Sequence, residues 1–206
     1  ALEQCCFILS GAVSKPWIIP QALSGANVSF AIRARVCLLR DLGAPLAPDN
    51  AWGIIQGLET APLRMKQHCS NAEKVVDFLT KHKSVTRVIY PTLHKGTVGD
   101  RAKKYFKGGN GALVGIEVKG GVEAGKKFIE ALKMFYHVAN IGDARSLAIH
   151  PATTTHSQLT EEELLAAGVT PGYVRLSIGI EHPDDIIADL KQALDASGKP
   201  GLKAVS

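Results

Sequence analysis

The stretch Tyr173-Val-Arg-Leu-Ser-Ile-Gly-Ile180 alternates between two kinds of side chain, which predicts a β-strand with two unlike faces. We expect its leucine and isoleucine side chains to pack under helices, and Arg175 to lie on the opposite face among small residues. An arginine in such a place is suited to bind a planar anion, because its guanidinium fork matches a carboxylate with two hydrogen bonds. A structural ion pair with Glu181 or Asp143 is the alternative, and the sequence leaves both open.

A second informative stretch is Asn140-Ile-Gly-Asp-Ala-Arg-Ser-Leu-Ala-Ile-His-Pro-Ala-Thr-Thr-Thr-His-Ser-Gln-Leu159. It predicts a polar loop, a short apolar strand that begins near Ser146, and a hydroxyl-rich loop. Ser146 lies where it can help to bind the carboxylate that Arg175 binds. The polar side chains of the two loops are expected to order them through hydrogen bonds to the backbone. The residues assigned to this loop-ordering role are Asn140, Thr155 and His156.

These stretches predict neither a catalytic nucleophile nor a metal site. His150 and His156 lack the spacing of a zinc-binding pair on a helix, and no cysteine or carboxylate cluster accompanies them. The three threonines before His156 have no assignable base and orienting acid. The glycine-rich stretch 108–111 precedes a strand instead of following one, so it predicts a turn and not a nucleotide-binding loop. The expected site therefore has no catalytic residue and no metal.

The composition is that of an ordinary globular protein, with 46% hydrophobic and 21% charged residues among 206. The net charge of +5 comes from scattered basic residues, so we expect no nucleic-acid partner. No apolar run reaches ~18 residues, so no membrane partner is expected. The chain has no signal-peptide pattern, and its cysteines lack paired zinc-type spacing, so we expect reduced thiols and a cytoplasmic protein. The cysteines are Cys5, Cys6, Cys37 and Cys69.

Helical and strand patterns alternate along most of the chain, which indicates an α/β fold with helices on one or both faces of a small sheet. Residues 1–28 show no sustained period and are expected to form an arm. Thr160 and Glu163 predict a capping box at a helix start. Helices are expected at Phe30–Leu42, from a cap at Asp49 or Asn50 to Gly57, and at Ala61–Lys81, Val98–Phe106, Val122–Leu132, Thr160–Ala167 and Asp184–Leu194. Strands are expected at Val85–Tyr90, Ala112–Val118, Phe135–Ala139, Ser146–His150 and Tyr173–Ile180.

Several motifs occur together in an order that resembles a known family. From about Phe30 to Leu194 the chain resembles the C-terminal part of the pyridoxal-phosphate enzymes of cysteine and methionine metabolism. Its Gly-Asp-Ala-Arg-Ser-Leu and Thr-Thr-Thr-His motifs are similar to the O-acetylhomoserine sulfhydrylase (homocysteine synthase) branch of that family. The matching segments are Ala34–Val36, Leu39–Gly43, Gln56–Thr60, Pro62–Met65, Ala139–Leu147, His150–Gln158 and Val174–Glu181.

The resemblance implies a fold and roles for two residues. The fold is the small C-terminal domain of a fold-type I enzyme, with a mixed or antiparallel sheet of about four strands covered by helices and preceded by a long interdomain helix. Residues 29–198 are assigned to this domain with its leading helices, and 199–206 to a tail. Arg175 matches the arginine that binds the substrate α-carboxylate, and Ser146 matches the serine beside it. The implied partners are a small amino-acid substrate and further copies of the chain in a homo-oligomer.

The resemblance also implies a chemistry. Enzymes of this branch use pyridoxal phosphate to make homocysteine, or methionine, from O-acetylhomoserine and sulfide or a thiol. The Ser-x-Thr-Lys that holds their cofactor has no match here, and Lys15 is the least unlike candidate. We therefore expect the large cofactor domain to be absent, and the chain alone to bind no pyridoxal phosphate and to be inactive. The alternatives are a relative of cystathionine γ-synthase or γ-lyase, and a non-catalytic remnant that binds a small acid or a partner.

Overall fold

The computed structural model describes residues 30–41, 43 and 46–198. The predicted arm at 1–28, with Lys15 and the first two cysteines, and the predicted tail at 199–206 lie outside the described residues. The chain divides into two compact units, residues 1–57 and 58–206. The first unit contains α2 (Phe30–Arg33), the π-helix η2 (Ala34–Asp41) and the start of α3. The helix predicted from Phe30 is therefore present, and its second part has the wider turns of a π-helix.

One long helix, α3 (Pro48–Lys81), stands where two helices were predicted. The predicted interruption before Ala61 is wrong, and Pro62 lies inside the helix. Proline lacks an N–H donor and its ring crowds the carbonyl four residues before it, yet the buried residues after Pro62 hold the rest of the helix against the core. Asp49 lies in the first turn, where its negative charge is favourable to the helix dipole, and does not precede the helix as a cap.

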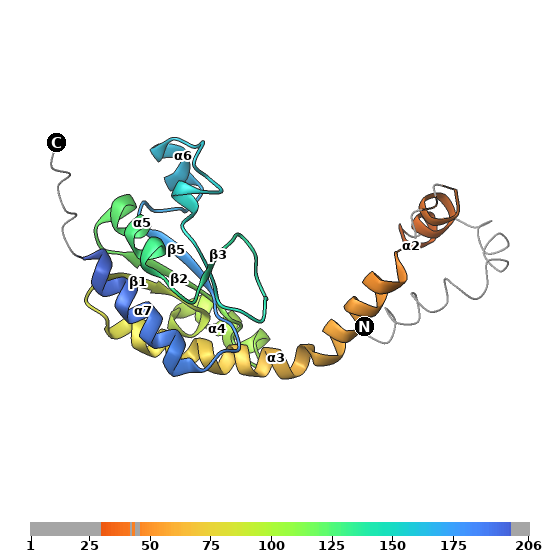
Figure 1. Ribbon diagram of the computed structural model, residues 1–206, viewed down its shortest axis with the longest axis horizontal. Helices are drawn as coiled ribbons and strands as arrows, with labels where there is room; N and C mark the ends of the chain where they lie inside the picture. Colours follow the sequence, from red (N-terminus) through yellow and green to blue (C-terminus); the bar gives the residue numbers. More distant parts are fainter. Residues whose placement is uncertain (1–29, 42, 44–45, 199–206) are drawn as a thin grey trace. The chain divides into compact units, whose positions relative to one another are not determined.

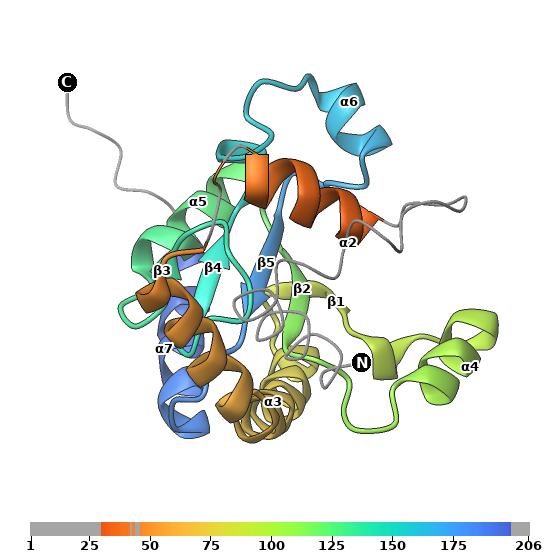
Figure 2. The ribbon, with the colours of Figure 1, turned by 90° about the vertical axis from the view of Figure 1, so that its right-hand side faces the viewer.

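The second unit is built on a five-stranded sheet in the order β1-β2-β5-β4-β3. Figure 2 shows these strands from β3 on the left to β1 on the right. The β3 and β4 strands are parallel and the other neighbours are antiparallel, so the sheet is mixed, and the short β3 is its fifth strand. The strands are β1 (Val85–Ile89), β2 (Leu113–Val118), β3 (Tyr136–His137), β4 (Leu147–Ile149) and β5 (Tyr173–Ser177).

Three helices, α3, α5 (Gly121–Ala131) and α7 (Pro183–Ser197), share one hydrophobic core with the sheet. Figure 1 shows α3 and α7 side by side, below the strands in that view. Val174 and Leu176 of β5 are fully buried in this core. The apolar half of the predicted alternation in β5 therefore packs under helices as expected, and the other half must point to the opposite face.

Shorter elements connect the strands. They are the 3-10 helices η3 (Pro91–Leu93) and η4 (Pro151–Thr153), and the α-helices α4 (Gly96–Tyr105) and α6 (Glu161–Ala166). The predicted capping box is confirmed at α6, where the Glu163 amide donates to Thr160 Oγ1 at 3.3 Å and the Thr160 amide donates to Glu163 Oε2 at 2.8 Å. Within the described ranges, no helix combines the length and the apolar character needed to cross a membrane.

A buried carboxylate from α7 fixes the turn that follows α5. Asp189 accepts hydrogen bonds from the amides of Lys133, Met134 and Phe135, at distances from 2.9 to 3.4 Å. Gln192 Nε2 donates to the same carboxylate at 3.0 Å. The amides after a helix need acceptors when they are buried, and Asp189 supplies them from a neighbouring helix. The contact therefore fixes the turn after α5 against α7, beside the hydrophobic core.

Replacing Asp189 by alanine should lower the free energy of unfolding by roughly 2–4 kcal/mol, because several partly buried amides lose their acceptor at once. Urea denaturation of the 206-residue chain measures this loss. Asp77→Ala is the matched control, since it removes only an exposed pair with Lys81 and should cost less than about 0.5 kcal/mol. Equal effects of the two substitutions would contradict the assigned role of Asp189.

Candidate functional site

Arg175 lies on the face of the sheet opposite the helical core. It is paired in register with Gly115 on β2 and with Ile149 on β4, and directly paired residues point to the same side of a sheet. Its side chain is partly buried. Gly115 has no side chain, so the paired position on β2 adds no group to this face. The strand pairing thus places the Arg175 guanidinium on the face of the sheet away from the helices, and its paired residue on β2 is a glycine.

The Arg175 guanidinium has a backbone carbonyl, and not a carboxylate, as its partner. Its Nη2 donates to the Asn140 carbonyl oxygen at 3.2 Å. None of the ion pairs among the described residues includes Arg175. The alternative of a structural pair with Asp143 or Glu181 is wrong, because Asp143 accepts from the Arg145 amide at 3.0 Å and Glu181 binds Ser146. The Arg175 guanidinium therefore has no counter-ion among the described residues, and its charge can attract an external anion.

The loop 138–145 runs along β5 and meets Arg175. The Gly142 amide donates to Ser177 Oγ at 3.2 Å, and the Ile180 amide donates to the Ala144 carbonyl at 2.9 Å. Asn140 bonds within the loop as well, because its Oδ1 accepts from the Ile141 amide at 2.9 Å. These contacts suit the loop-ordering role predicted for Asn140, which stays a prediction. The strand β5 ends at Ser177, before the predicted end at Ile180.

Ser146 is fully buried at the end of this loop. Its amide donates to Glu181 Oε1 at 2.7 Å and its hydroxyl donates to Glu181 Oε2 at 2.9 Å. The Gly179 amide donates to the same hydroxyl oxygen at 2.9 Å. The predicted contact between Ser146 and a substrate carboxylate therefore has no free donor in this arrangement. Ser146 anchors the loop behind Arg175, and Arg175 alone of the two presents donors to the outside.

The second loop is tied down by its own hydroxyl groups. Thr154 Oγ1 donates to the His150 carbonyl at 2.9 Å, and Thr155 Oγ1 lies 2.8 Å from His156 Nδ1. The buried His150 ring contacts the Pro171 carbonyl through Nε2 at 2.8 Å and Thr153 Oγ1 through Nδ1 at 2.9 Å. Across the described ranges, no three histidine, cysteine, aspartate or glutamate residues are grouped to hold a metal ion. The contact between Thr155 and His156 agrees with a loop-ordering role, which remains a prediction.

Burial lowers the pKa of His150 below its ordinary value of 6.5, because desolvation disfavours the charged imidazolium, and the bond to the Pro171 carbonyl opposes this shift. The unfolded chain therefore takes up this proton first as pH falls. The contribution of His150 to stability should be complete above pH 6.5 and should decrease as the pH falls through the pKa of the folded state. A proton NMR titration of the His150 ring should give a midpoint below 6.5. A midpoint at or above that value would contradict the assignment.

Tyr173 is a site residue that the sequence analysis missed. A β-carbon added to Gly115 would lie 2.8 Å from Tyr173 Cε2 and 3.0 Å from its hydroxyl oxygen, so the ring lies across the glycine. Burial raises the pKa of the Tyr173 phenol, and the positive charge of Arg175 acts in the opposite direction. The signal was available, because Tyr173 is two residues before Arg175 and so shares its face. The phenol therefore lies on the same face of the sheet as the guanidinium, which influences its pKa.

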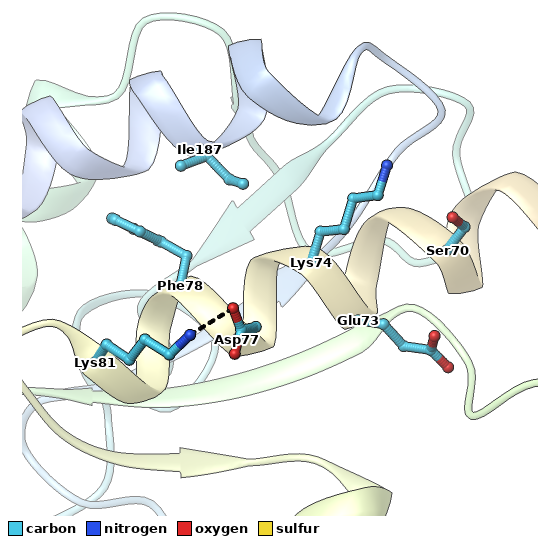
Figure 3. A pocket seen from close by; sticks show the side chains of 7 residues that line it. All are labelled: Ser70, Glu73, Lys74, Asp77, Phe78, Lys81 and Ile187. Atoms are coloured by element: carbon cyan, nitrogen blue, oxygen red, sulfur yellow. Dashed lines mark hydrogen bonds and ion pairs between the residues drawn. The ribbon is translucent and has the colours of Figure 1, made fainter.

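A groove lies on the other side of the domain, between α3 and α7 (Figure 3). Its volume is about 640 Å³. Phe78 and Ile187 form an apolar floor, and the Lys81 ammonium is paired with Asp77 at 2.7 Å. The remaining lining residues are Ser70, Glu73 and Lys74. The groove contains neither a nucleophile with a base nor Arg175, so the sheet face is the stronger candidate site.

This chain is similar to known proteins both in amino-acid sequence and in fold. The model of the family described as Cys/Met metabolism PLP-dependent enzyme matches residues 21–195, which includes the last part of the predicted arm. The chain is 55% identical over 175 residues to the O-acetyl-L-homoserine sulfhydrylase of Leptospira meyeri, covering 84% of this chain and 40% of that protein. It is 46% identical over 170 residues to the L-methionine gamma-lyase of Fusobacterium nucleatum subsp. polymorphum, covering 82% of this chain and 43% of that protein.

The structure is similar to that of an O-acetylhomoserine (thiol)-lyase from Campylobacter jejuni, with a TM-score of 0.73 and 49% sequence identity. The match covers 81% of this chain and 39% of that one, which carries N'-pyridoxyl-lysine-5'-monophosphate. This chain therefore spans about 40% of the length of the relatives that it matches.

Proposed function

Because this chain belongs to the family of Cys/Met metabolism PLP-dependent enzymes, we propose that it is the C-terminal domain of a transferase that makes homocysteine, or methionine, from O-acetylhomoserine and sulfide or a thiol. Its contribution is the clamp for the substrate carboxylate. One observation carries the proposal: the Arg175 guanidinium has a single carbonyl partner and no carboxylate partner among the described residues.

The physical role of Arg175 follows from its donors. A guanidinium has five N–H groups, and the bond to Asn140 uses one of them. A carboxylate that approaches the open side of the fork accepts two parallel charge-assisted bonds, which fix its position and its orientation together. The fixed carboxylate in turn orients the bonds at the adjacent α-carbon, so the same contact supports both binding and reaction. We assign Ser146 to holding the loop that orients Arg175.

The described residues near Arg175 do not fit the cofactor itself. A Schiff base with pyridoxal phosphate needs a lysine, and neither the strands of the sheet nor the loop 138–145 contains one. They fit the carboxylate of a small acid instead. We therefore propose that the cofactor is held by other parts of the complete protein, and that the chain alone neither binds it nor forms homocysteine.

The proposal includes two further properties. We expect a homo-oligomer, because α3 presents Leu63 with 74% of its surface exposed, together with Met65 at 43% and Leu58 at 38%, and apolar surface of this kind is usually covered by protein. We also expect a cytoplasmic location, because Cys37 and Cys69 are free thiols.

A lyase is the second candidate function. The 46% identity to an L-methionine gamma-lyase supports it, because the carboxylate clamp serves any amino-acid substrate equally. The two functions differ in the bond that is broken and in the acceptor, neither of which Arg175 contacts. Assays with methionine and with O-acetyl-L-homoserine plus sulfide separate them.

A domain graft tests the proposed function. Residues of this chain replace the matching 175 residues of the Leptospira meyeri sulfhydrylase. The graft should convert O-acetyl-L-homoserine and sulfide to homocysteine, because the clamp is supplied by this chain and the remaining groups by the host protein. Homocysteine formation is measured directly. A folded graft that binds pyridoxal phosphate and makes neither homocysteine nor the lyase products would contradict the proposal.

In the same graft, Arg175→Lys should raise KM for O-acetyl-L-homoserine by roughly tenfold to a hundredfold, because the charge remains but the two-bond fork is lost. Arg87→Lys is the matched control, since Arg87 is an exposed arginine on β1 that pairs weakly with Glu117 at 3.5 Å. It should leave KM within about twofold. An unchanged KM in the Arg175 variant would show that Arg175 does not bind the substrate.

A further inference from the structure

Glu181 is a carboxylate near the candidate site that the proposed clamp does not use. Its two oxygens accept from the Ser146 amide at 2.7 Å and from the Ser146 hydroxyl at 2.9 Å. Glu181 is partly buried, and no ion pair in the described part of the chain includes it. A desolvated carboxylate without a cation depends on its hydrogen-bond donors. Its link to Ser146 is therefore a strong local constraint.

The segment that carries Glu181 is held from the other side by α3. His68 Nδ1 lies 2.6 Å from the Ile178 carbonyl oxygen, and Asn71 Nδ2 donates to the carbonyls of Gly179 and Glu181 at 3.0 and 2.8 Å. Both His68 and Asn71 are buried. Residues 178–181 are therefore fixed against the core before they reach Ser146. The Glu181 carboxylate then joins this fixed segment to the loop 138–145 through its two hydrogen bonds with Ser146.

Ser146 directly follows the loop 138–145, so its hydrogen bonds fix the end of that loop. Its hydroxyl oxygen accepts from the Gly179 amide, and its carbonyl accepts from the Tyr136 amide at 3.0 Å. The approach is close, because a β-carbon at Gly179 would lie 2.5 Å from the Ser146 nitrogen and 2.6 Å from the Ala144 carbonyl oxygen. Such distances exclude a side chain at position 179. The end of the loop is thus locked at one point, from which the chain runs back to the Asn140 carbonyl.

We propose that Glu181 is a positioning residue for the carboxylate clamp. By fixing Ser146 it fixes the loop whose Asn140 carbonyl orients the Arg175 guanidinium. This inference rests on the proposed function of Arg175. Orientation matters because a planar fork gains two bonds to a carboxylate only when the two planes are aligned. Without the Glu181 contact, the guanidinium samples other orientations, and the clamp weakens although every group that touches the substrate is still present.

Amide hydrogen exchange and NMR on the intact 206-residue chain test the first step. Glu181→Gln keeps the shape of the side chain but replaces one acceptor oxygen by an NH2 donor, so one Ser146 donor loses its partner. Exchange at the Ser146 amide should accelerate about tenfold or more, and the Arg175 Nε–H signal should shift. Glu181→Asp should act similarly, because it is one methylene too short to reach both donors. Glu130→Gln, an exposed glutamate on α5, is the control and should change neither signal. Unchanged protection of Ser146 in both Glu181 variants would overturn the proposal.

A double-mutant cycle in the domain graft separates positioning from general stability. Glu181→Gln alone should raise KM for O-acetyl-L-homoserine about fivefold or more. In the Arg175→Lys background it should cause no further rise, because Glu181 acts through the lost fork, and residues that act through one another are not additive. Additive effects would overturn the proposal and would assign Glu181 to stability alone. An inactive wild-type graft would contradict the function proposed for the chain, while the exchange measurement would still decide whether Glu181 fixes the loop.

Discussion

The antiparallel pairing of β5 with β2 and β4 is the constraint on which the site depends. Val174 and Leu176 are fully buried under the helices, so the side chains between them must point to the other face of the sheet. A slip of one residue would place the Arg175 charge in the core and the apolar side chains outside, which burial forbids. The core therefore sets where the guanidinium is presented. The loop 138–145 then sets how it is oriented.

Asp143 and Glu181, the two carboxylates considered as partners of Arg175, both accept hydrogen bonds from other groups. Asp143 accepts a backbone amide within its own loop, and Glu181 binds Ser146. Asp143 and Glu181 therefore have hydrogen-bond donors of their own, and the Arg175 guanidinium stays available for another anion. A neutralised arginine would be a structural element, whereas an arginine with only a carbonyl partner at 3.2 Å retains affinity for a further anion. The same contacts occupy both donors of Ser146 in this structure.

Periodicity and turn chemistry predicted the strands and most helices to within a few residues, because local patterns determine them. The capping box at Thr160 is such a local signal. The structure differs where distant contacts decide. Pro62 interrupts the local helical pattern, yet α3 continues through it because its later residues are held in the core. The hydrogen bonds of the buried Ser146 also depend on Glu181, which lies 35 positions away and which no window of sequence reveals.

The chain spans about 40% of the length of its relatives. We propose that Arg175 binds a substrate carboxylate. The most direct measurement follows the Arg175 Nε–H signal by NMR while the chain is titrated with O-acetyl-L-homoserine, and then with its methyl ester. We expect a saturable shift of the Arg175 signal with the free acid and none with the ester, because the ester lacks the carboxylate. No shift with the acid, or an equal shift with the ester, would contradict it.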